Sequence, residues 1–217
     1  ASFLQKKHEY SLSPMSLNDF LQKVSAKCFG KIWVDIDFCF LENSIGELDA
    51  KEIKAVMLVN RSLDFIFKSL LFYDDVTDFD EDFNNDIINS TMILGIDLGK
   101  LAVKELFEAK GHLYTKLEER GIIDDAVAMG NILYTKGINC LMEAKEYTQI
   151  MDADALTFCA KVLRLFLMRK TLPKGAGLNA KTILKSLESF TKVKTSIPEY
   201  LKSYERTEVW NTNQCKI

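Results

Sequence analysis

Hydrophobic residues recur at helical spacing along most of the chain. The longest such stretch follows a capping-box spacing, Asp49 to Glu52, and can run as one helix from Ala50 to about Asp78. Residues 32–41 combine β-branched and aromatic side chains, but because the sequence offers no partner strand we expect a helix there too. The pattern predicts a single all-α domain over residues 1–217, a bundle of about six to eight helices. The other predicted helices cover residues 17–29, 85–120 with a break at Gly95, 124–150 and 179–195. A further predicted helix is capped by Asp152 or Asp154 and runs to Lys170.

The predicted helix over residues 124–150 has a distinctive start and a distinctive face. Asp124 and Asp125 are acids in its first turn, where negative charge stabilises a helix. Gly130 and Gly137 are seven residues apart and therefore lie on nearly the same side of the helix after two turns. This side predicts close packing against a neighbouring helix.

Composition narrows the class of protein. The 217 residues carry a net charge of −3, with 47% hydrophobic and 27% charged residues, which is typical of a globular protein. Without a dense Lys/Arg block we expect no nucleic-acid partner. The apolar stretch at residues 55–73 contains Asn60, Arg61, Asp64 and Lys68, so it is predicted as a buried helix and not as a transmembrane span. Five cysteines without CxxC spacing, and no apolar signal core at the start, predict a cytoplasmic protein.

The most informative segment lies at the end of the long predicted helix, where residues 70–82 read LLFYDDVTDFDED. Asp74, Asp75 and Asp78 form a DDxxD pattern, and residues four apart share one face of a helix. Carboxylates at this spacing repel one another unless a cation lies between them. Hard oxygen ligands of this kind suit Mg²⁺, which commonly bridges a protein to substrate phosphates. The pattern therefore predicts magnesium-assisted departure of a diphosphate.

An apolar helix that ends in this cluster resembles the first aspartate-rich motif of the class I isoprenoid synthases, the trans-prenyltransferases and terpene cyclases. The resemblance covers residues 50–86 and implies an all-α bundle that holds an allylic prenyl diphosphate through Mg²⁺. It implies a transferase or lyase that ionises this substrate, followed by prenyl transfer or cyclisation. By the same resemblance Asp74 and Asp78 would bind the metal directly with Asp75 in support, and Asp64 and Lys68 would border the substrate.

Other parts of the family pattern are changed in this sequence. The terpene cyclases carry a second metal motif, which has a partial counterpart in Asn131, Thr135 and Asn139 with an amide in place of its carboxylate. Asn131 and Thr135 are therefore further candidates for substrate binding. Residues 81–84 (EDFN) stand where prenyltransferases carry an arginine pair, and no second DDxxD is present. The chain is also short for the family, as a fragment or a reduced member would be.

These departures support a second hypothesis, a non-catalytic helical interaction module or partner subunit. Its acidic residues would be solvated, and a large apolar patch would lie elsewhere on its surface. Either hypothesis is compatible with a homodimer or a heterodimer.

Two further interpretations concern the acidic segment alone. A metal-free, solvated loop is one, because runs of charge are commonly surface. A calcium loop is the other, since residues 78, 80, 82, 84 and 86 are spaced like EF-hand ligands. Phe83 and Asn89 occupy the positions where that loop needs glycine and a bidentate glutamate.

Overall fold

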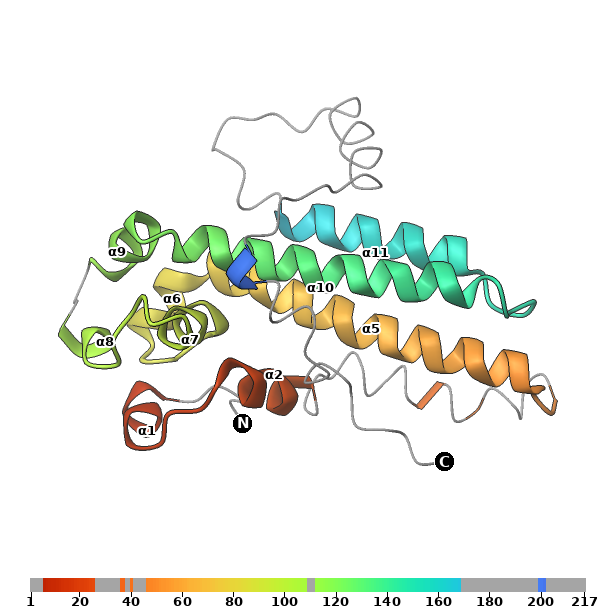
Figure 1. Ribbon diagram of the computed structural model, residues 1–217, viewed down its shortest axis with the longest axis horizontal. Helices are drawn as coiled ribbons and strands as arrows, with labels where there is room; N and C mark the ends of the chain where they lie inside the picture. The colour runs from red at the N-terminus through yellow and green to blue at the C-terminus, as the bar shows by residue number, and fades with distance from the viewer. Residues whose placement is uncertain are drawn as a thin grey trace, which may run out of the picture. The chain divides into compact units, whose positions relative to one another are not determined.

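The computed structural model describes residues 6–25, 36–37, 40, 46–108, 112–168 and 199–201, which are mostly helical (Figure 1). These residues contain no β-strand, although an isolated antiparallel bridge joins Lys6 to Ile87. This confirms the all-α fold class. No helix in these ranges is long and apolar enough to cross a bilayer. The helices are α1 (Lys7–Leu12), α2 (Leu17–Ser25), α5 (Ala50–Thr77), α6 (Phe79–Asn84), α7 (Ser90–Asp97), α8 (Glu105–Glu108), α9 (Leu113–Glu119), α10 (Ile122–Ala144), α11 (Ala153–Met168) and the 3₁₀ turn η3 (Glu199–Leu201).

Backbone packing divides the chain into two compact units, each of which is described by itself. Unit 1 comprises Ala1–Lys27, Leu71–Asn131 and Ile197–Ile217, and unit 2 comprises Cys28–Leu70 and Ile132–Ser196. The single domain over the whole chain stays a prediction. The helix predicted over residues 179–195, and most of the one over residues 32–41, lie outside the described residues.

The start of α5 is held by two carboxylates of unit 2. Asp49 Oδ1 accepts hydrogen bonds from the N–H groups of Lys51 (2.8 Å) and Glu52 (2.9 Å), as the capping box predicts. A capping box also predicts that the Glu52 side chain accepts a hydrogen bond from the Asp49 N–H. That part of the prediction is wrong, because Glu52 accepts hydrogen bonds from Thr148 Oγ1 at 2.8 Å and from the Gln149 N–H at 2.6 Å. Glu52 therefore ties the first turn of α5 to the connection between α10 and α11.

The prediction for residues 85–120, a helix with a break at Gly95, is wrong because the structure divides this segment into the three helices α7, α8 and α9. Asn89 caps α7, and its Oδ1 accepts a hydrogen bond from the Met92 N–H at 3.2 Å. α7 stops just before Gly99, whose φ of 67° is a left-handed conformation that glycine adopts at little cost. The break therefore follows the predicted position, Gly95, by one helical turn.

The core of unit 2 forms where α5, α10 and α11 lie side by side (Figure 1). A Cβ atom at Gly137 would lie 2.7 Å from Ile66 Cγ1 and 2.9 Å from the Ser62 carbonyl oxygen. Ser62 Oγ donates a hydrogen bond to the Gly137 carbonyl oxygen at 2.7 Å. This confirms the close packing predicted for the glycine face. The buried apolar cluster of this core contains Val59, Ile66, Tyr134, Leu141, Ala144 and Ala160.

We expect Gly137→Ala to lower the free energy of unfolding by about 1–3 kcal/mol, because the added Cβ has to displace the α5 backbone as well as Ile66. On an exposed helix the same change would stabilise by about 1 kcal/mol, so the sign of the effect is diagnostic. Urea unfolding measures it. Asn139→Ala is the control, because Asn139 is exposed on the same helix and should change stability by less than about 0.5 kcal/mol. A more stable Gly137→Ala would contradict the close approach.

Charged side chains link the shorter helices of unit 1. Arg120 donates to both carboxylate oxygens of Glu105, at 2.9 and 2.8 Å, and to the Lys100 carbonyl oxygen at 2.8 Å. The Arg120 guanidinium lowers the pKa of Glu105 to about 2. Asp125 lies in the first turn of α10, as predicted, and also pairs with Lys100 Nζ at 2.5 Å and accepts a hydrogen bond from the Tyr200 hydroxyl.

The Glu105–Arg120 pair makes stability depend on pH in the acid range. Because the pKa of Glu105 falls from 4.5 to about 2 on folding, its contribution is complete above pH 4.5 and is lost as the pH falls towards 2. We expect Glu105→Gln to melt a few degrees below the native chain at pH 7, since an exposed pair contributes little. The two melting curves should converge between pH 4.5 and 2. A difference that persists to pH 2, or an equal effect of Glu118→Gln on α9, would contradict this assignment.

Candidate functional site

The buried carboxylate at the end of α5 belongs to Asp75, in unit 1. Its Oδ2 accepts a hydrogen bond from the Ser90 N–H at 2.7 Å, and its carbonyl oxygen accepts one from Asn89 Nδ2 at 3.1 Å. Burial raises the pKa of Asp75 to about 7, against the effect of the Ser90 hydrogen bonds, and the charges of Asp82 and Asp74 add to the rise. Asp75 therefore anchors the start of α7 to the end of α5.

Three half-buried acids, Asp74, Asp78 and Asp82, surround this anchor and are called the acidic cluster below. The Asp78 N–H donates to the Asp74 carbonyl oxygen at 2.8 Å, which continues the helical spacing across the junction between α5 and α6. Burial raises the pKa of Asp82, and the charges of Asp78, Asp74 and Glu81 raise it further. Asn89 Nδ2 opposes this shift by donating to Asp82 Oδ2 at 3.1 Å. The cluster is therefore a region of mutual carboxylate repulsion.

The carboxylate oxygens of the acidic cluster suit a hard cation, although they do not surround a common point as a complete set of metal ligands would. Within the ranges that the structure describes, no three Asp, Glu, His or Cys side chains are grouped so that they could hold a metal ion. Asp75, which the sequence also predicts as a ligand, already accepts the Ser90 N–H. Asp74 and Asp78 are half-buried carboxylates one helical turn apart. Such a pair fits Mg²⁺, which typically keeps several waters and uses one or two protein carboxylates.

The acidic segment after α5 is itself helical. Residues Phe79–Asn84 form α6, in which Asp80 and Glu81 are exposed and Asp82 is half-buried. An EF-hand needs an open loop at these positions, so the calcium-loop interpretation is wrong. The solvated-loop interpretation is also wrong in its secondary structure, although it describes the exposure of Asp80 and Glu81.

Asp64 and Lys68, predicted to border a substrate, form a buried ion pair within unit 2. Lys68 Nζ lies 2.7 Å from Asp64 Oδ2, and the two side chains are only 5% and 1% exposed. A buried charge needs a partner of opposite sign, and each residue supplies this for the other. This contact explains both residues structurally without a ligand.

Asn131 is buried in unit 1, and its Oδ1 accepts a hydrogen bond from the Tyr73 hydroxyl at 2.7 Å. A Cβ atom at the neighbouring Gly130 would lie 2.7 Å from Tyr73 Cε1, so the tyrosine ring packs directly on the helix backbone. Thr135, the other substrate-binding candidate on α10, is half-buried in unit 2, and Asn139 is exposed.

Two residues at the start of α7 complete this site, the cap Asn89 and the first helical residue Ser90, and neither was a site candidate predicted from the sequence. Asn89 bonds Asp75, Asp82 and the Met92 N–H, and Ser90 supplies its backbone N–H to Asp75. An asparagine followed by two polar residues and the apolar run Met92–Leu94 is a helix-start signal. It was hidden because residues 85–120 also fit one continuous helical pattern.

Comparisons of the chain with known protein families, curated proteins and solved structures found no match. The acidic cluster is therefore interpreted from its own chemistry and from the resemblance at residues 50–86.

We expect Asp75→Ala to lower the free energy of unfolding by about 1–3 kcal/mol, because it leaves the buried Ser90 N–H without its acceptor. Asp75→Asn keeps an acceptor oxygen and removes a buried charge, so it should cost less than the alanine variant. Urea unfolding at neutral pH compares the two. The control is Asp80→Ala, which removes an exposed acid from α6 and should change little. Equal effects of Asp75→Ala and Asp80→Ala would refute the anchoring role.

Proposed function

We propose that the protein binds Mg²⁺ together with the diphosphate group of an allylic prenyl diphosphate at Asp74 and Asp78. The observation that carries the proposal is the placement of the half-buried Asp74 and Asp78 one helical turn apart, with the half-buried Asp82 one turn further on. Burial raises the pKa of Asp82, and the charges of the neighbouring carboxylates raise it further. A cation bound among them would relieve this repulsion. The DDxxD pattern and the helical surroundings match the resemblance to class I isoprenoid synthases.

Asp74 and Asp78 would hold the metal, with water and diphosphate oxygens as its remaining ligands. Bound Mg²⁺ supplies charge neutralisation for the diphosphate that leaves as the allylic C–O bond breaks. Asp75 would still accept the hydrogen bond from the Ser90 N–H, and Asp82 would add negative charge beside the metal ligands. The reaction would be prenyl transfer or cyclisation. Cys140 and Cys159 are free thiols, which fits our proposal of a cytoplasmic location.

A non-catalytic interaction module is the second candidate function. Two of the predicted substrate-binding positions, Lys68 and Asn131, are already engaged by partners within the protein. In addition, α11 exposes several large apolar side chains, as expected of a surface that binds another protein.

The first candidate is tested by thermal melting with Mg²⁺ and inorganic diphosphate, separately and together. We expect the combination to raise the melting temperature by roughly 5–10 °C at ligand concentrations about 100-fold above Kd, more than the two separate effects combined. The increase should disappear in Asp74→Ala/Asp78→Ala. Asp80→Ala/Glu81→Ala removes two exposed acids from the same segment and should keep the increase.

A combined increase that is lost only in the first variant would justify an activity screen with allylic diphosphates. No increase for a folded native chain would overturn the magnesium–diphosphate proposal and favour the interaction module. Stabilisation by a divalent cation alone, without any effect of diphosphate, would support a cation site at these residues. It would contradict the proposal that the substrate is a prenyl diphosphate.

A further inference from the structure

The outward side of α11 in unit 2 is apolar along its described length. Phe158 is 58% exposed, Val162 41%, Leu163 47% and Phe166 53%. Exposed Ala155 and Cys159 complete the set. We call these six residues the α11 face: Ala155, Phe158, Cys159, Val162, Leu163 and Phe166.

Helical geometry places the α11 face in one continuous stripe. Each member lies three or four residues from another member, a spacing that places both on the same side of the helix. The stripe from Ala155 to Phe166 is about 16 Å long at 1.5 Å per residue. None of its residues is charged or strongly polar.

The opposite side of α11 is unusually polar for a buried surface. Thr157 and Arg164 are buried there beside Ala160, and the Arg164 guanidinium lies 4.5 Å from the centre of the Tyr134 ring. A surface helix normally buries its aromatic residues and exposes its charged ones. α11 instead exposes Phe158 and Phe166 and buries Arg164, although its Asp154 is exposed as usual. Exposed aromatic residues are expected where the outer side of a helix is also an interface.

The α11 face is complementary to itself. If two copies of α11 pack antiparallel about a two-fold axis between residues 160 and 161, residue 155 lies opposite 166, 158 opposite 163, and 159 opposite 162. The small Ala155 thus meets the large Phe166 at both ends, and Cys159 meets Val162 near the axis. A two-fold axis requires self-complementarity of this kind. The absence of charge on the stripe removes the like-charge repulsion that two identical surfaces would otherwise suffer.

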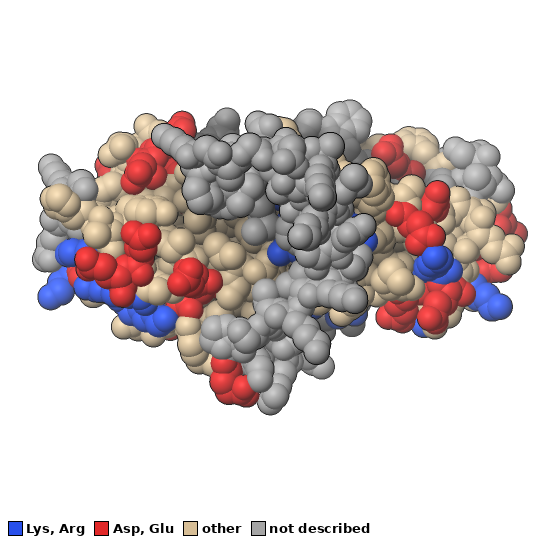
Figure 2. All heavy atoms as spheres, turned by 90° about the horizontal axis from the view of Figure 1, so that it is seen from above, with Lys and Arg blue, Asp and Glu red and all other residues tan. Residues whose placement is uncertain are grey.

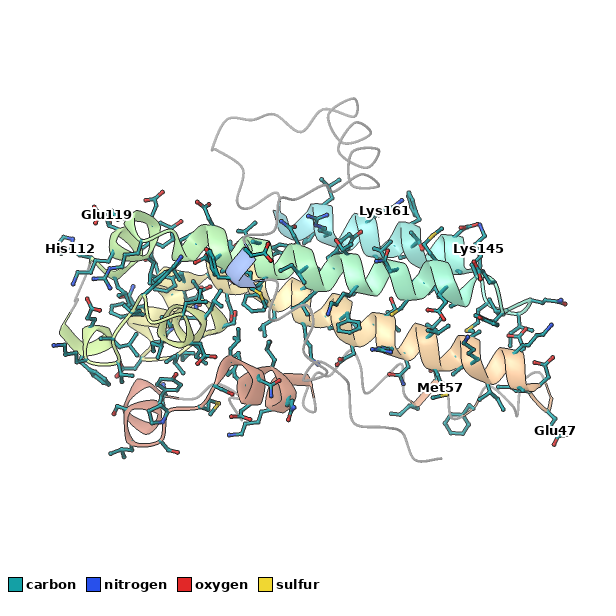
Figure 3. All side chains as sticks on the ribbon, in the orientation of Figure 1. Glu47, Met57, His112, Glu119, Lys145 and Lys161 are labelled. Carbon is teal, nitrogen blue, oxygen red and sulfur yellow. The ribbon has the colours of Figure 1, made fainter. Side chains whose placement is uncertain are left out.

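Charged groups flank this stripe as a rim. Lys145, at the end of α10, pairs with Asp154 at 2.6 Å beside the start of α11, and Lys161 projects from α11 itself (Figure 3). Seen from above in Figure 2, acidic and basic side chains lie close together at the right of the view, with uncharged surface beside them. An apolar centre with a polar rim is the usual composition of a protein interface.

We infer that the α11 face binds the α11 face of a second copy of this chain and forms a two-fold homodimer. An exposed aromatic side chain presents about 150–250 Å², so the two half-exposed phenylalanines contribute on the order of 200 Å² per copy. The whole stripe is smaller than the roughly 800 Å² per partner of a standard interface. The dimer is therefore a reversible one, with a Kd on the order of 10 µM. The inference does not depend on metal or diphosphate binding.

Sedimentation velocity from about 1 to 200 µM tests the dimer with the full chain. The native chain should change from monomer to dimer across this range. Val162→Glu places two like charges near the two-fold axis and should weaken association at least 30-fold. Met57→Glu introduces the same charge at an exposed apolar residue of α5 and should dimerise like the native chain. Circular dichroism checks that each variant is folded, and Phe158→Ser is the second variant should Val162→Glu fail to fold.

The alkylation rate of Cys159, followed by mass spectrometry of its peptide, gives a second readout. It should fall several-fold as the native chain dimerises and stay constant for Val162→Glu. A native chain that is monomeric at 200 µM overturns the inference. If Cys159 is protected in that monomer, another part of the same chain covers the α11 face. A dimer that survives both Val162→Glu and Phe158→Ser also overturns it, because its interface then lies elsewhere.

Discussion

The close approach of α5 to α10 is the constraint on which the other contacts depend. In unit 2 it occurs at Gly137, where the absence of a side chain lets Ser62 bond the α10 backbone. In unit 1 it occurs at Gly130, where the Tyr73 ring packs on the same helix. Both contacts need a glycine because a Cβ would overlap the neighbouring helix at less than 3 Å. Within unit 1, the hydrogen bonds of Asn89 and Ser90 to Asp75 join the acidic end of α5 to the start of α7.

The aspartates of the DDxxD segment differ in role, since one is structural and the other two belong to the proposed cation site. Asp75 is buried and accepts the Ser90 N–H, so its carboxylate organises the chain. Asp74 and Asp78 are half-buried and remain in a region of negative potential together with Asp82. Burial of one acid beside others is electrostatically unfavourable and persists only because backbone and amide donors compensate it. A cation would compensate it further, which is the physical basis of the proposed site.

Sequence and structure give different accounts of the other candidates. Asp64 and Lys68 were predicted to border a substrate, but residues at this i, i+4 spacing can also form an ordinary ion pair. The structure forms the ion pair and buries both of its side chains. Asn131 illustrates the same limit, since its partner Tyr73 is 58 residues away in the sequence.

The sequence by itself determined the all-α class, the long helix from Ala50, the acidic motif at its end and the glycine face of α10, because each depends on local spacing or on one residue type. Tertiary structure decided the division of residues 85–120, the partner of Glu52 and the separate position of Asp75. It also decided which side of α11 is exposed. These depend on which distant segment competes for a donor or a surface, and helical periodicity carries no information about that competition.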